Sequence, residues 1–143
     1  SLDGVPVPTG YGAWASLITN GKTNYGESAG DDGYPNLLKY ATGSSPQVPD
    51  ERAHLDASLV GGALTMHFHR NTNAVDTAII VERSPSLATN ATWTGLATNT
   101  AGSWGSSTGM VSETGSGFWV EAAMTLPAQS ATNSFHRVRV RLN

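Results

Sequence analysis

The feature that most constrains the fold is the strict alternation of residues 135–142. Two sets of side chains alternate along this stretch: His136, Val138, Val140 and Leu142 in one set, and Arg137, Arg139 and Arg141 in the other. A period of two is that of a β-strand, whose successive side chains point to opposite faces. The stretch is therefore predicted as a strand with one apolar face and one face that carries a row of guanidinium groups.

Similar short runs, separated by turn residues, fill the chain from residue 54 onward. The expected strands cover residues 54–59, 63–70, 76–83, 92–97, 109–113, 117–124 and 135–142. A Gly61-Gly62 turn separates the first two, and residues 98–109 are expected to form a long polar loop. Short strands at this spacing predict an all-β fold, namely a two-sheet antiparallel β-sandwich of the jelly-roll type.

The first third of the chain has a different pattern. Residues 1–10 are expected to be the end of a linker, and residues 11–20 a short helical segment. A second helix is predicted from Pro35, which suits a first helical turn, to Gly43, which suits a helix stop. Its buried face is expected to hold Leu37, Leu38 and Ala41. One or two short N-terminal helices should thus close one end of the sandwich, and residues 1–143 are expected to form one domain.

Composition narrows the function classes. Charged residues make up 13% of the 143 residues and the net charge is -3, which argues against nucleic-acid and anionic-membrane partners. The chain has no cysteine, so disulfides, thiolate metal sites and a cysteine nucleophile are excluded. Abundant Gly, Ser, Thr, Ala and Asn with few Lys favour a secreted bacterial β-module. Because the chain begins at Ser1, it is interpreted as a mature or excised fragment.

Two groups of motifs resemble the terminal modules of large secreted proteins from environmental bacteria. The first is Trp14 followed by DDGYPNLLKYATGSSP at residues 31–46; the second is FHRN at 68–71, VERS at 81–84, Leu87, Trp93 and FHRVRV at 135–140. The chain is also similar to carbohydrate-binding module family 81, which comprises small β-sandwiches appended to endoglucanases. This resemblance implies a non-catalytic, monomeric module that binds β-glucan, such as cellulose-type chains, and is joined to a glycoside hydrolase domain in one secreted polypeptide.

The acidic loop at Asp31 and Asp32 raises the question of a calcium site. Such a loop needs carboxylates at alternate positions and a bidentate acid at position twelve. With Gly33 as position six, position three is Gly30 and position twelve is Lys39. We therefore expect no cofactor, with a weak or rearranged calcium site near Asp31 and Asp32 as the alternative. Asp32 and Asn36 are instead expected to cap the helix that follows.

Tryptophan side chains are the main candidates for sugar contact, because they offer a flat apolar ring with a polar handle. Trp104 lies in the Gly/Ser-rich segment AGSWGSS and is expected to be exposed. Trp119 is expected on the outward face of its strand together with Glu121. Trp14 is expected in the core; Trp93 is also favoured as core but is kept as a binding candidate.

His67 and His69 share the polar face of one predicted strand. They are interpreted as hydrogen-bonding groups for sugar hydroxyls. A metal-binding pair is the second interpretation, although the sequence names no third ligand. Solvated histidines are the third. The arginines at 137, 139 and 141 are expected to form salt bridges or a solvated face.

No pattern selects a catalytic site. Residues 105–109 match G-x-S-x-G, but a nucleophile elbow joins a strand to a helix, and this segment lies between β-segments. A glycosidase needs two facing carboxylates, and nothing singles out a pair among Glu82, Glu113 and Glu121. The module is expected not to be an enzyme. Besides polysaccharide binding, a structural or cell-surface anchoring module and a calcium-stabilised spacer remain open.

Overall fold

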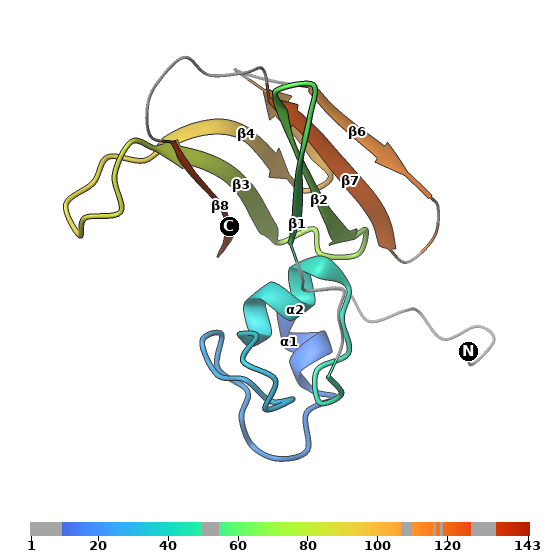
Figure 1. Cartoon of the computed structure of the whole chain (residues 1–143). Coiled ribbons are helices and arrows are strands. Elements are labelled where there is room, and N and C mark those ends of the chain that lie inside the picture. Colours follow the sequence, from blue (N-terminus) through green and yellow to red (C-terminus); the bar gives the residue numbers. More distant parts are fainter. Residues whose placement is uncertain (1–9, 50–54, 107–109, 116, 118, 127–133) are drawn as a thin grey trace.

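The computed structural model describes residues 10–49, 55–106, 110–115, 117, 119–126 and 134–143. Within this part of the chain, two four-stranded antiparallel sheets pack together above two short helices (Figure 1). Sheet A has the order β1 (Asp56–Val60), β2 (Ala63–Asn71), β7 (Trp119–Leu126) and β6 (Met110–Thr114). Sheet B has the order β5 (Ser103–Ser106), β4 (Thr94–Thr100), β3 (Thr77–Ser84) and β8 (Phe135–Leu142). The helices are α1 (Tyr11–Ala15) and α2 (Asn36–Thr42). The predicted sandwich with short N-terminal helices is confirmed, whereas residues 1–9 of the predicted linker lie outside the described residues.

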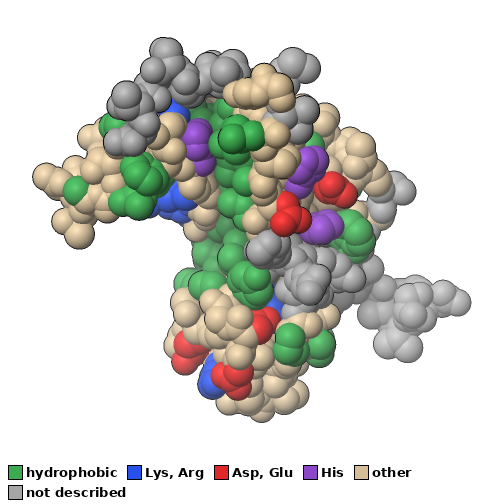
Figure 2. Space-filling view, viewed as in Figure 1, with side chains coloured by type: hydrophobic (Ala, Val, Ile, Leu, Met, Phe, Trp, Pro, Cys, Tyr) green, Lys and Arg blue, Asp and Glu red, His purple; other side chains and the backbone are tan. Residues whose placement is uncertain are grey.

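The core lies between the two sheets and follows from strand alternation. On β7, buried and less buried side chains alternate along the whole strand. The side chains that point inward from both sheets form one apolar cluster: Met66, Phe68, Ile79, Val81, Leu96, Ala97, Ala122, Met124 and Leu126, together with Ala41 of α2. Burying this surface is the main favourable term for the fold. Figure 2 shows a strip of hydrophobic side chains that reaches the surface between the sheets and continues down to the helical segment.

The predicted polar loop over residues 98–109 is wrong over residues 98–106, and residues 107–109 lie outside the described part of the chain. β4 continues to Thr100, and β5 pairs with it from Ser103 onward. The connection is therefore a two-residue hairpin turn of Ala101 and Gly102, both with positive φ (50° and 91°). Such turns favour Asn-Gly or Asp-Gly. The less usual Ala at the first position, which adopts positive φ at some cost, hid the turn from sequence analysis.

α2 exists where it was predicted, but its buried face differs from the prediction. Gly43 ends the helix in the left-handed conformation, with φ of 81°. Leu37 and Leu38 are only half-buried, whereas Asn36, Lys39 and Tyr40 are almost completely buried. The reason is that polar groups of the preceding loop, rather than apolar side chains alone, surround this side of the helix.

Asn36 organises that loop instead of capping the helix. Its Oδ1 accepts a hydrogen bond from the Ala29 amide at 3.0 Å, and its Nδ2 donates to the carbonyls of Lys22 and Asn24, each at 2.8 Å. The N-cap position is Pro35, and no side chain caps the helix there. The predicted capping role of Asn36 and Asp32 is therefore wrong, because both side chains turn toward the loop.

Lys39, at the position where a calcium loop would carry its bidentate acid, occupies the centre of this loop. Its ammonium donates to Asp32 Oδ2 at 2.6 Å and to the Val48 carbonyl at 2.8 Å. The two side chains of this ion pair are 0% and 8% exposed. Burial alone would raise the pKa of Asp32. The hydrogen bonds from Lys39, the Tyr34 amide and Ser28, together with the charge of Lys39, outweigh burial and hold the pKa below its usual range. Asp31 points elsewhere and pairs with Lys22 at the surface.

The helical segment is joined to the sandwich by aromatic packing and by Asp76. The rings of Tyr11, Trp14 and Tyr40 contact one another, so the predicted core position of Trp14 is confirmed. Asp76, next to the start of β3, accepts hydrogen bonds from the Tyr11 amide at 2.8 Å and from the Tyr40 hydroxyl. Burial and this carboxylate raise the pKa of Tyr40. The phenol is therefore a hydrogen-bond donor throughout the physiological range.

Candidate functional site

The outer face of sheet A, which points away from the core, gathers most of the predicted binding residues. On β2, Met66 and Phe68 point inward, so His67 and His69 point outward. On β7, Val120 and Ala122 are buried, so Trp119 and Glu121 point outward. In the β2–β7 register, His69 lies opposite Glu121. Strands far apart in the sequence thus bring His67, His69, Trp119 and Glu121 onto one face.

The contacts within this group are specific. The rings of His69 and Trp119 meet edge to face, with centroids 4.7 Å apart and an interplanar angle of 77°. His67 Nδ1 lies 3.4 Å from Glu121 Oε1, and these two side chains are 41% and 49% exposed. Trp119 is half-buried, and the hydroxyl-bearing Thr65 and Thr125 lie opposite each other on the same face. The group therefore combines one aromatic ring with several polar groups accessible to solvent.

The end of α2 supports Trp119 from behind. A Cβ at Gly43 would lie only 3.1 Å from the Trp119 Cβ, and Gly43 has a positive φ that favours glycine. Asn71, which lies opposite Trp119 in the sheet, donates from Nδ2 to the Tyr40 carbonyl at 2.9 Å. The helical segment thus fixes the backbone around the aromatic residue of the site. This support was not predictable from the sequence, because only Gly43 carried a signal and that signal indicated a helix stop.

The structure supplies no further metal ligands beside His67 and His69 among the residues that it describes. Among the residues that the structure describes, no group of three or more His, Asp or Glu side chains is arranged to hold a metal ion. Glu121 Oε1 lies 3.4 Å from His67 Nδ1. The arrangement is suited to hydrogen bonding with a polar ligand.

Trp104 is partly buried and packs against the core, which overturns its predicted exposure. It belongs to β5 and lies opposite Asn99, which is buried. Its ring packs against the main core and meets Phe68 at a centroid distance of 6.0 Å. The short β5 strand turns the indole inward even though its sequence neighbours are Gly and Ser. Trp104 is therefore a packing residue and not part of the outer face of sheet A.

Trp93 is also separate from that face. It precedes β4 of sheet B and is half-buried. The Arg137 guanidinium lies 4.0 Å from the ring centroid, in a cation–π arrangement. The predicted binding residues thus divide into four that meet on sheet A and two, Trp93 and Trp104, that do not.

The three glutamates on the described strands point to three different faces. Glu82 lies on the outer face of sheet B, where Arg137 Nε donates to it at 2.7 Å and Arg139 Nη2 at 3.1 Å. Glu113 points inward and receives two hydrogen bonds from Arg70, at 2.6 and 3.0 Å. Glu121 lies on the outer face of sheet A. Burial acts to raise the pKa of Glu82 and of Glu113, but their arginine partners hold both pKa values below the usual range.

These shifts predict a loss of stability in acid. The folded-state pKa values of Glu82 and Glu113 are lowered from 4.5. Their contribution to the free energy of unfolding is therefore complete above about pH 4.5 and is lost as the pH falls through the folded-state values. Burial and, to a lesser extent, the nearby Arg83 lower the pKa of His136 from 6.5. Below about pH 6.5 the unfolded chain therefore binds this proton more readily than the folded one, and the free energy of unfolding begins to fall. Urea unfolding across pH 3 to 8 should show a small decline that starts near pH 6.5 and a steeper one below 4.5. Constant stability over this range would contradict the assigned ion pairs.

No family model, curated protein or solved structure matches the chain. Neither described helix has the length and hydropathy needed to cross a membrane.

Proposed function

We propose that the outer face of sheet A binds a polysaccharide chain, with β-glucans such as cellulose-type chains as the ligand class. The observation that carries the proposal is the meeting of Trp119, His69, His67 and Glu121 on one solvent-facing sheet surface. In this proposal the module is non-catalytic and monomeric, and keeps an appended glycoside hydrolase close to its substrate outside the cell.

The chemistry of the face suits a sugar ring. The C–H face of a pyranose is apolar and stacks on an indole, while its hydroxyls both donate and accept hydrogen bonds. Trp119 offers the ring for stacking, and its edge-to-face contact with His69 fixes the orientation of the indole. His67 and Glu121 supply exposed donor and acceptor atoms nearby, and their 3.4 Å contact orients them toward each other. A flat sheet surface lets an extended chain lie across it without a closed pocket.

Replacing Trp119 with alanine should weaken binding to a soluble β-glucan by about 1–3 kcal/mol, by analogy with the stacking of a nucleobase on an aromatic side chain. Affinity electrophoresis in gels containing barley β-glucan or hydroxyethylcellulose measures this loss. Trp93→Ala is the matched control, since it removes a half-buried indole from sheet B. The Trp93→Ala protein should be retarded by the glucan in the gel as strongly as the wild-type protein.

Because Trp119 packs against Gly43, a second variant separates binding from folding. His67→Ala combined with Glu121→Ala removes exposed side chains and should weaken binding with little change in melting temperature. If the wild-type protein is retarded by no glycan on a broad panel, or if folded Trp119→Ala and His67→Ala/Glu121→Ala proteins bind as tightly as wild type, this face is not a sugar site. Loss of surface display on deletion of the module would then favour the anchoring alternative.

A further inference from the structure

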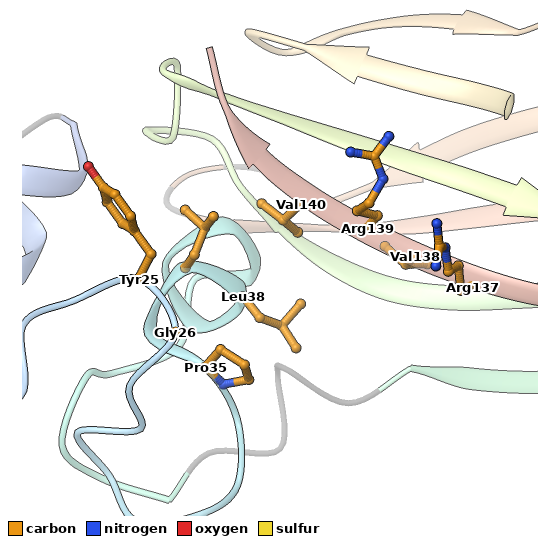
Figure 3. A pocket seen from close by; sticks show the side chains of 9 residues that line it. Tyr25, Gly26, Pro35, Leu38, Arg137, Val138, Arg139 and Val140 are labelled. Carbon is orange, nitrogen blue, oxygen red and sulfur yellow. The ribbon is translucent and has the colours of Figure 1, made fainter. Parts of the chain in front are cut away.

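An apolar groove lies between β8 and the segment that carries α2. It has a volume of about 400 Å³ and opens to solvent. Figure 3 shows its two walls: Tyr25, Pro35 and Leu38 on one side, and Val138 and Val140 of β8 on the other. A smaller cavity of about 80 Å³, also lined by Leu38, Val138 and Val140, continues toward Phe68 and Ile79 of the core. The groove therefore opens toward the main apolar cluster.

β8 is an edge strand, because in the described sheet it pairs with β3 alone. The other side of its backbone thus lacks a strand partner within the described part of the chain. Edge strands present unpaired N–H and C=O groups that can template a further strand. Here the inward side chains next to this edge, Val138 and Val140, are half-buried and line the groove.

The charge along β8 limits what can pair with it. Arg137, Arg139 and Arg141 are exposed on its outer face, and among the described residues Glu82 is the one carboxylate hydrogen-bonded to this row. The edge thus carries excess positive charge. A second copy paired antiparallel through β8 would set two arginine rows beside each other, and like charges across strands are destabilising. A strand with acidic side chains on this face would be complementary.

We propose that β8 and the groove accept an extended peptide in which apolar residues alternate with Asp or Glu. The peptide would add to the edge of sheet B, so that main-chain hydrogen bonds supply affinity and alternate side chains supply specificity. Its apolar side chains would enter between Val138, Val140 and Leu38, and its carboxylates would lie beside Arg139 and Arg141. This surface is separate from the outer face of sheet A, so the inference does not depend on sugar binding.

The probe is a capped (Val-Glu)4 peptide, tested by isothermal titration calorimetry and by amide chemical shifts of the intact chain. Binding should shift the amides of residues 137–141, and a capped (Val-Lys)4 peptide should not bind. Arg141→Glu should weaken binding of (Val-Glu)4 by roughly fivefold, the upper end for one cross-strand charge pair. Lys22→Glu is the control: it makes the same change in net charge on an exposed side chain of the helical segment. It should leave binding unchanged.

Any of three binding results would overturn the proposal: no binding of (Val-Glu)4 at millimolar concentration, equal binding of the Glu and Lys peptides, or equal affinity of the wild-type and Arg141→Glu proteins. Sedimentation that shows a dimer mediated by β8 would also overturn it, because a second copy would then occupy the edge.

Discussion

Replacing Lys39 with methionine should lower the free energy of unfolding by about 3–5 kcal/mol, the cost of removing one partner of a buried ion pair. The substitution leaves the Asp32 carboxylate, whose side chain is 8% exposed, without its ammonium partner. It also removes the donor to the Val48 carbonyl. Methionine keeps the length and most of the volume of the lysine stem. The lost free energy of unfolding therefore reflects the missing charge rather than a cavity. Urea unfolding followed by tryptophan fluorescence measures it.

The structure offers a matched control in the pair of Lys22 and Asp31. These residues are of the same types, but their side chains are 44% and 73% exposed. Lys22→Met should therefore cost less than about 1 kcal/mol. The deficit of Lys39→Met should shrink as the pH falls through the pKa of Asp32, because a protonated carboxyl no longer needs a cation. Equal losses in the two variants would show that the Lys39 pair is not buried in solution.

Replacing Glu113 with alanine should also destabilise the protein by about 3–5 kcal/mol. Glu113 receives both hydrogen bonds of the Arg70 guanidinium in the interior, and Arg70 is 8% exposed. Without the carboxylate, a guanidinium that can hardly lose its proton remains inside the sandwich. Thermal unfolding monitored by circular dichroism should show a marked fall in melting temperature.

Glu121→Ala serves as the control for Glu113→Ala. Glu121 lies on the neighbouring strand, but its side chain is 49% exposed and its partner His67 is 41% exposed. Its removal should change the free energy of unfolding by less than about 1 kcal/mol. If Glu113→Ala proves as mild as Glu121→Ala, the inward orientation of Glu113 and Arg70 is wrong. If Glu121→Ala leaves the free energy of unfolding nearly unchanged, any loss of sugar binding in this variant is not caused by unfolding.

Local patterns predicted several elements closely. The alternation over residues 135–142 corresponds to β8 (Phe135–Leu142). Gly43 marked the end of α2, because a helix stop in the left-handed conformation favours glycine. Alternation also placed His67 with His69, and Trp119 with Glu121, since each pair lies two residues apart on one strand.

The same reasoning failed where a residue's environment comes from another part of the chain. Trp104 has only small and polar sequence neighbours, yet β4 turns it toward Phe68 of the opposite sheet. Lys39 was recognised as the wrong residue for a calcium ligand, but its burial follows from Asp32 and Val48, which lie before and after the helix. Leu37 and Leu38 were expected to be buried, and instead Leu38 lines the groove beside β8.

The β-sandwich class, the short N-terminal helices and the facing of side chains on strands such as β2, β7 and β8 could be predicted from the sequence, because these features follow from the repeat of the backbone and from residues such as glycine and proline. The pairing of β2 with β7 and the register of that pair are known only from the folded chain. Strand pairing is a contact between distant segments, and its register is chosen by how the inward side chains of both sheets pack. That choice brings His69 to Trp119 and His67 to Glu121, and it leaves β8 at an edge.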